Sequence, residues 1–155
     1  MCTIPGVSAR TAVMLLVECG ADITVFRTPA HLASWAGICP GNNTSGGRSR
    51  TGRTRHGSIA LRTALTEAAH AAARTKNTYL AAHHAHIRGR RGLHKAVGST
   101  RHDLLIAYWH VVHDEVDYVA LGPDSQRRRS TDHRTRRLVH QLERLGHVVT
   151  LGPGR

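Results

Sequence analysis

The chain has 155 residues, 40% of them hydrophobic and 4% aromatic, and its 22 basic and 10 acidic residues give a formal net charge of +12. This length predicts one domain, with a compact core of alanine, leucine and valine. The charge favours a polyanionic partner, nucleic acid before membrane. Compositional drift is the alternative explanation, but it accounts less well for the scarcity of acidic residues.

Cysteine spacing and hydropathy indicate which broad class of protein this is. Cys2, Cys19 and Cys39 show no CxxC spacing, which argues against a disulfide scaffold and for reduced thiols. We expect Cys39 to be a buried apolar residue and not a nucleophile. The longest apolar run, Ala12–Val17, is too short to cross a bilayer, and the N-terminus shows no signal peptide. The sequence therefore predicts a cytoplasmic protein without a membrane partner.

The N-terminal residues predict a tight turn followed by a helix. Ser8 is a good N-cap for a helix over Ala9–Cys19, and Gly20 ends it. An apolar-Pro-Gly-apolar turn before a helix is similar to the second half of a helix-hairpin-helix, in which backbone N–H groups, here near Gly6, hold a DNA phosphate. The first helix of such a motif would precede Met1. An ordinary turn and cap explain the pattern equally well.

A brief helix is expected next. Thr28 caps it, Pro29 occupies its first position, and it continues to Gly37. Phe26 and Trp35 are predicted to lie in the core of a small helical bundle and not to act as stacking platforms for bases.

The segment Thr44–Gly57 is rich in glycine and arginine. Ser45 stands before Gly46 and Gly47, which allow a tight turn and leave room for an approaching partner. Guanidinium groups suit phosphate recognition, because their forked donors match its oxygens. Four of them follow the serine, on Arg48, Arg50, Arg53 and Arg55. This combination indicates phosphodiester chemistry, or at least phosphate binding.

Three further helices are predicted before the acidic loop. Ser58 caps Ile59–Arg74, whose apolar face carries Leu61, Leu65, Ala68 and Ala72, while Arg62 lies off that face and can point back at the loop. Asn77–Arg88 carries His83, His84 and His86 at a spacing too weak for a metal site, so we expect none. A basic turn, Gly89–Gly92, leads into Leu93–His113. The buried stripe of that helix comprises Ala96, Val97, Leu104, Leu105, Tyr108, Trp109 and Val112; His94, Arg101 and His102 face water or a phosphate backbone, and Gly98 is a point of interruption.

The C-terminal part is expected to be a basic tail. Asp114, Glu115 and Asp117 form an acidic cluster within one short loop, which we interpret as surface and not as a metal site. A helix follows over Asp132–Leu145, with its arginines outward and Leu138, Leu142 and Leu145 inward, and His147–Leu151 is extended. We therefore divide the chain into residues 1–122 and 123–155. The fold class is mainly α: a small helical domain with a helix-hairpin-helix-like start, a long Gly/Arg loop and a basic C-terminal helix.

The order of these features resembles the C-terminal, serine-bearing domain of insertion-sequence transposases of the one-ten/one-sixteen/nine-oh-two family. The resemblance covers nearly the whole chain, and it rests on the series and not on any single piece. The matching positions are Ile4-Pro5-Gly6-Val7, Thr11-Ala12, Phe26, Leu32-Ala33, Gly37, Pro40, Ser45-Gly46, Gly52, Gly57, Arg62, Leu65, Ala68-Ala69, Leu104-Leu105, Trp109, Tyr118 and Leu121-Gly122.

The resemblance implies a two-part enzyme. In such transposases an N-terminal RuvC-like domain holds Mg²⁺ with four acidic residues, and a serine attacks a DNA phosphodiester to form a covalent phosphoserine. Ser45 matches that nucleophile; Thr44, Ser49 and Ser58 stay open as rivals. The resemblance also implies DNA and a guide RNA as partners, and a homo-oligomer. The residues assigned to DNA binding are Gly6, Gly46, Gly47, Arg48, Arg50, Arg53, Arg55 and Arg62.

Two departures from the family pattern shape the expectation. The acidic, metal-binding half is absent from this sequence, so we expect no cofactor in this chain and Mg²⁺ in a partner domain. Ser8 stands where many relatives have a second hairpin glycine. The chain then corresponds to a truncated product, a decayed copy or a separately encoded half, and as an enzyme it would be inactive alone. The alternative is a non-catalytic nucleic-acid-binding remnant; a small ribosome-associated protein fits the charge but not the motif series.

Overall fold

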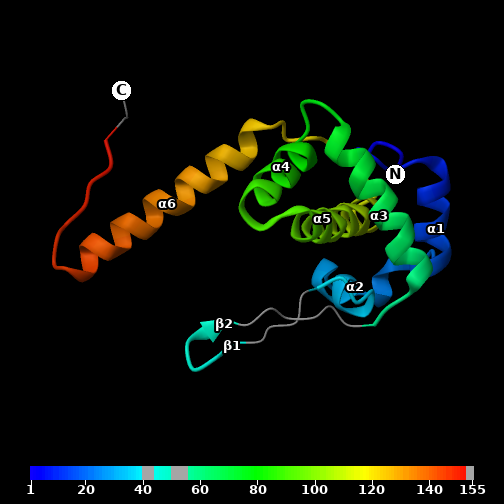
Figure 1. Ribbon diagram of the computed structural model, residues 1–155, viewed down its shortest axis with the longest axis horizontal. Helices are drawn as coiled ribbons and strands as arrows, with labels where there is room; N and C mark the ends of the chain where they lie inside the picture. The colour runs from blue at the N-terminus through cyan, green and yellow to red at the C-terminus, as the bar shows by residue number, and fades with distance from the viewer. Residues whose placement is uncertain (40–43, 50–55, 153–155) are drawn as a thin grey trace.

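A computed structural model describes residues 1–39, 44–49 and 56–152, without the side chains of 44, 48, 49 and 126–130 (Figure 1). The described part is mainly helical, as predicted, and its one sheet is a two-stranded hairpin. The elements are α1 (Ala9–Cys19), the 3₁₀ helix η1 (Ile23–Val25), α2 (Pro29–Trp35), β1 (Thr44–Ser45), β2 (Arg48–Ser49), α3 (Ile59–Arg74), α4 (Tyr79–Arg91), α5 (Leu93–His113) and α6 (Asp124–Arg144).

Side-chain hydroxyls cap the N-termini of four of the helices. The hydroxyls of Ser8, Thr28, Ser58 and Thr78 each accept a hydrogen bond at 3.2 Å from the backbone N–H three residues later. Each bond satisfies one of the donors that a helix N-terminus otherwise leaves unpaired. The first three caps were predicted, and the bounds of α1 and α3 are confirmed.

The region between α4 and α5 differs from the prediction. The residues Gly89-Arg90-Arg91, expected as a turn, complete α4, and only Gly92 leaves the helical conformation, with φ of +83°. Gly89 does not end α4, because the two arginines that follow it are good helix formers. The helix ends at Gly92, whose positive φ is the usual helix stop. The bounds of α5 are as predicted, and Gly98 does not interrupt it.

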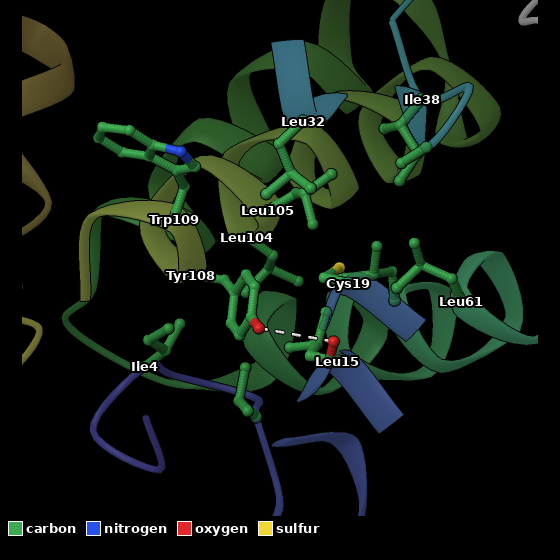
Figure 2. Packing of buried hydrophobic residues seen from close by; sticks show 14 of the residues in the cluster. Ile4, Leu15, Cys19, Leu32, Ile38, Leu61, Leu104, Leu105, Tyr108 and Trp109 are labelled. Carbon is green, nitrogen blue, oxygen red and sulfur yellow. Dashed lines mark hydrogen bonds between the residues drawn. The ribbon is translucent and has the colours of Figure 1, made fainter. Parts of the chain in front are cut away.

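The core is organised around α5, which packs against α2, α3 and α4. Leu104, Leu105 and Tyr108 are fully buried among side chains from the N-terminal turn, α1, α2 and α3, as Figure 2 shows. The Tyr108 hydroxyl donates to the carbonyl of Leu15 at 3.5 Å. The indole N–H of Trp109 donates to the carbonyl of Phe26 at 2.9 Å, so both polar tips in the core have partners. Burying each large apolar side chain contributes about 1.5–3 kcal/mol.

Two expectations about the core are wrong. Trp35 is 51% exposed, and it contacts the half-buried Phe26 with ring centroids 5.3 Å apart. α2 is short and presents Leu32 and Ala33 to the core, so the indole is left on its outer side. On α5, Val111 is buried and Val112 only half-buried, a difference of one position at the end of the stripe.

The C-terminal helix has no buried residue among those whose side chains are described. α6 begins at Asp124, earlier than predicted, and extends away from the other helices in Figure 1. Leu138, Leu142 and Leu145 are 50%, 42% and 75% exposed, so their predicted inward placement is wrong. Their spacing produces an apolar stripe on the helix, but no other described element covers it. Residues 145–152, the part after α6 that the structure describes, are irregular and form no strand.

None of the described helices combines the length and the apolar character needed to cross a membrane.

Candidate functional site

The predicted nucleophile lies in the hairpin. Ser45, the last residue of β1, lies directly opposite Arg48, the first residue of β2. Gly46 and Gly47 connect them with φ of +57° and +74°. Positive φ at both central residues is the mark of the type I′ turn, which glycine adopts without steric penalty. The tight turn predicted from the two glycines is therefore present.

The tip of this hairpin is open. Ser45, Gly46 and Gly47 are exposed, and a β-carbon at either glycine would meet no atom within 4 Å. Within the described residues, the Ser45 hydroxyl makes no hydrogen bond, and no imidazole or carboxylate contacts it. The geometry leaves Ser45 accessible to a large partner, but this part of the chain supplies no base to activate it.

The far end of the loop is anchored to α2. Gly57 packs so closely on the end of α2 that a β-carbon there would overlap the Ala36 carbonyl oxygen and lie 3.2 Å from the Gly37 nitrogen. The chain leaves α2 at Gly37 and returns beside it at Gly57, so the hairpin with Ser45 is the excursion between these two points. Glycine at position 57, which the resemblance included, thus has a packing reason.

The rival nucleophiles differ in what the structure shows. The Ser58 hydroxyl caps α3 by accepting from the Leu61 N–H, so a structural role already explains it. Thr44 and Ser49 are paired across the hairpin.

Burial raises the pKa of the half-buried Cys39 thiol, which disfavours the thiolate and agrees with its predicted inert role.

The glycine of the N-terminal turn contacts α3. Gly6 has φ of +84°, and a β-carbon there would lie 2.5 Å from the backbone nitrogen of Ala72 and 2.9 Å from its α-carbon. The small residues on this face of α3 let the two backbones approach. Close packing therefore requires glycine at position 6, and its predicted phosphate contact stays a prediction.

The arginines predicted to bind DNA fall into two groups. Arg50, Arg53 and Arg55 lie outside the described residues, as does the side chain of Arg48. Arg62 is described: it lies half-buried in the second turn of α3.

A polar cluster between α3 and α5 was not predicted from the sequence. The Thr66 hydroxyl donates to the carbonyl of Arg62 at 2.7 Å and accepts from Nη1 of Arg101 at 3.3 Å. Arg101 was expected to face water or phosphate, but it is half-buried, and burial together with the nearby charge of Arg62 lowers the pKa of its guanidinium. No sequence signal pairs these residues, because they are far apart in the chain.

The histidines of α4 have structural partners. His84 is buried, and its Nδ1 lies 3.0 Å from the Thr100 hydroxyl. The Nδ1 of His83 lies 2.6 Å from a carboxylate oxygen of Asp103. Burial alone would raise the pKa of Asp103, but His102 and His83 together hold it below the ordinary value. Asp114, which directly follows α5, binds two exposed histidines of the last turn of that helix.

Across the described ranges, no group of three or more His, Cys, Asp or Glu residues is arranged to hold a metal ion. The donor set for the Mg²⁺ that the resemblance implies is thus not formed by these residues.

Comparison with known proteins identifies the lineage. The sequence profile described as "Transposase IS116/IS110/IS902 family" matches residues 1–85, more than half of the chain. The insertion element IS110 uncharacterized 43.6 kDa protein of Streptomyces coelicolor is 54% identical over 44 residues, which cover 28% of this chain and 11% of that relative. No solved structure matches the chain. The matched residues include the N-terminal turn, the serine hairpin and α3, and the chain belongs to the transposase IS116/IS110/IS902 family.

Proposed function

We propose that this chain carries the serine-bearing part of a DNA-processing active site, with Ser45 as the nucleophile of insertion-sequence transposition. The observation that supports this most is the position of Ser45: exposed, beside an open glycine turn, and inside the region that matches the transposase family. The glycines allow a bulky phosphodiester to reach the hydroxyl. The arginines that follow Ser45 in the sequence would neutralise the phosphate that the hydroxyl attacks.

The proposed chemistry is a phosphoryl exchange. The oxygen of Ser45 forms a bond to phosphorus, and the bond from phosphorus to one deoxyribose oxygen breaks. The serine proton is lost, and the leaving oxygen gains a proton, so a serine phosphodiester replaces a DNA phosphodiester. The number of phosphodiester bonds is unchanged, and the stored bond can then be used to join a new strand.

The remaining components are proposed to come from outside the described residues. A weakly acidic hydroxyl needs a base or a metal, and the described residues place neither beside Ser45. An acidic, Mg²⁺-binding domain is the expected partner, together with DNA and a guide RNA, and a homo-oligomer would bring two serine loops to the two strands.

The test is a covalent-adduct assay. The chain is combined with the acidic domain of a related transposase, its guide RNA and end-labelled DNA, and denatured samples are separated by gel electrophoresis. A labelled protein band is expected for the wild type and for Ser49→Ala, and it should disappear for Ser45→Ala. An adduct that persists in Ser45→Ala, or that is lost only in Ser49→Ala, would rule out Ser45 as the nucleophile.

The alternative is a nucleic-acid-binding protein without chemistry. In that case the arginines only neutralise phosphates, and Ser45→Ala changes no measurable property. DNA affinity would still fall steeply with salt concentration. The two functions therefore differ in the adduct and not in binding.

A further inference from the structure

An arginine of α5 reaches the face of α3 that carries Arg62, just after the serine loop. Arg62 and Thr66 are one turn apart on α3 and so share a face of that helix. Arg101 reaches this face from α5, where its Nη1 donates to the Thr66 hydroxyl at 3.3 Å. Its Nη2 lies 3.9 Å from the point where a β-carbon of Gly98 would stand, so the guanidinium packs between α3 and α5.

This arrangement is unfavourable in the protein alone. The Nε of Arg101 is buried and has no hydrogen-bond partner among the described residues. No carboxylate in the described part of the chain lies within ion-pair distance of Arg101, and the charge that acts on it is the like charge of Arg62. A half-buried cation beside another cation destabilises a fold unless an anion joins them.

The missing partner has a definite chemistry. A guanidinium presents several N–H donors in a plane, a geometry that matches the oxygens of phosphate. A phosphate on the face of α3 that carries Arg62 and Thr66 would give the Arg101 guanidinium the anionic partner that the described carboxylates do not supply. The site adjoins the point where the serine loop returns to the bundle, since the backbone N–H of Arg62 donates to the carbonyl of Ser58, the N-cap of α3.

We propose that Arg62 and Arg101 jointly bind one phosphate group of the nucleic-acid backbone beside the serine loop. This inference rests on the proposed function, because it takes the DNA that Ser45 attacks as the source of that phosphate. Arg101 acts as a positioning residue: it holds the strand in register without touching the reacting atoms. It lies outside the region that matches the family profile.

A double-variant cycle tests whether the two arginines share one phosphate. Binding of the full chain to a fluorescein-labelled DNA duplex is measured by anisotropy at several salt concentrations. Arg62→Gln and Arg101→Gln should each weaken binding about 10-fold, the size expected for hydrogen bonds to a charged group. The combined variant should lose clearly less than the product of the two. The slope of log affinity against log salt should fall by about one in each single variant and no further in the combination.

The matched control is Arg74→Gln, which changes an exposed arginine in the last turn of the same helix. Arg74→Gln has its own effect on DNA affinity, and in the double variant with Arg101→Gln the two fold-losses in affinity should multiply. Independent, multiplicative losses for Arg62→Gln and Arg101→Gln would overturn the shared site.

A stability measurement separates this site from a structural role of Arg101. Without nucleic acid, Arg101→Met should keep or raise the Tm, because it removes a buried unsatisfied donor and a like-charge contact. Inorganic phosphate should raise the Tm of the wild type more than that of Arg101→Met. A Tm several degrees lower in Arg101→Met, with unchanged salt dependence of DNA binding, would show a structural residue and overturn the proposal.

Two further arms identify the source of the phosphate. The first repeats the double-variant cycle with an RNA duplex of the same sequence. If only RNA shows the less-than-multiplicative loss of affinity, the site binds RNA and the DNA assignment is overturned. A response to inorganic phosphate without any effect on DNA binding would indicate a free-anion site, with the same consequence. All these measurements are made without chemistry, so they stand or fall separately from the Ser45 adduct assay.

Discussion

The α-carbon of Gly57 lies against the backbone of Ala36, so closely that a β-carbon at position 57 would be 2.7 Å from the Ala36 carbonyl carbon. This contact joins the return of the serine loop to the end of α2. α2 in turn packs on α5 through fully buried residues such as Leu32. The position from which the hairpin with Ser45 extends is therefore fixed by backbone packing between the segment at Gly57 and the end of α2.

Gly57→Ala should destabilise the fold. The added methyl group overlaps backbone, which cannot move aside as a flexible side chain can, so we expect a loss of about 1–3 kcal/mol in the free energy of unfolding. Urea denaturation followed by circular dichroism measures it. Gly89→Ala is the control: it lies within α4 with no atom within 4 Å of the added carbon and should stabilise the helix by up to about 1 kcal/mol. Equal stability of the two variants would contradict the packing role of Gly57.

Gly6→Ala should also lower stability, by about 2 kcal/mol or more, because position 6 combines φ of +84° with backbone contact to α3. Thermal unfolding gives the stability, and the salt dependence of DNA affinity, measured well below the Tm, reports any phosphate contact. We expect the slope to be unchanged, since packing already accounts for the glycine. A slope reduced by about one, with no change in stability, would instead support the phosphate contact that the N-terminal turn predicted.

Leucines that follow the same helical spacing should contribute differently to the free energy of unfolding. Leu104→Ala removes a fully buried side chain from the centre of α5 and should cost about 2–5 kcal/mol. Leu142→Ala changes a side chain that is 42% exposed on α6 and should cost no more than about 0.5 kcal/mol. Chemical denaturation of the two variants at low protein concentration provides the comparison. A large loss for Leu142→Ala would mean that α6 is covered in solution.

Stability should decrease on acidification because of His84. The Thr100 hydroxyl donates to the carbonyl of Ala96 at 3.0 Å, so its oxygen accepts from the Nδ1–H of a neutral His84. Burial, followed by the charges of Arg88, His70 and His83, lowers the pKa of His84 below 6.5. The unfolded chain then binds more protons than the folded chain, so the free energy of unfolding falls as the pH drops from about 6.5 toward the folded pKa.

The pH effect is measured by denaturation at pH 7.5 and 5.5. His84→Asn, which cannot titrate, should show a smaller difference between the two conditions than the wild type. His86→Gln changes an exposed histidine of the same helix and should leave the difference unaltered. The same pH dependence in the wild type and His84→Asn would assign the effect to other groups.

The bounds of the helices were largely readable from the sequence. Ser8 and Gly20 delimit α1, Ser58 begins α3, and Leu93–His113 is the full extent of α5. These signals are local: a hydroxyl caps a backbone donor three residues away, and a left-handed glycine ends a helix at its own position. The open turn next to Ser45 was predictable for the same reason, because two adjacent glycines specify its dihedral angles.

Other features depended on which surfaces meet. The sequence marks Trp35 and Leu138 as apolar but does not say whether another element covers them, and both are exposed. Burial is a property of long-range packing, which periodicity along one helix does not contain.

The sequence by itself thus determined the helical elements, the glycine turn beside Ser45 and membership of a transposase family, all carried by neighbouring residues or by ordered motifs. Only the tertiary structure showed that Gly57 packs on Ala36, that Gly6 packs on α3, and that Arg101 of α5 donates to Thr66 of α3. Contacts between residues distant in the chain follow from how α3 packs on its neighbours, and no short segment encodes that packing.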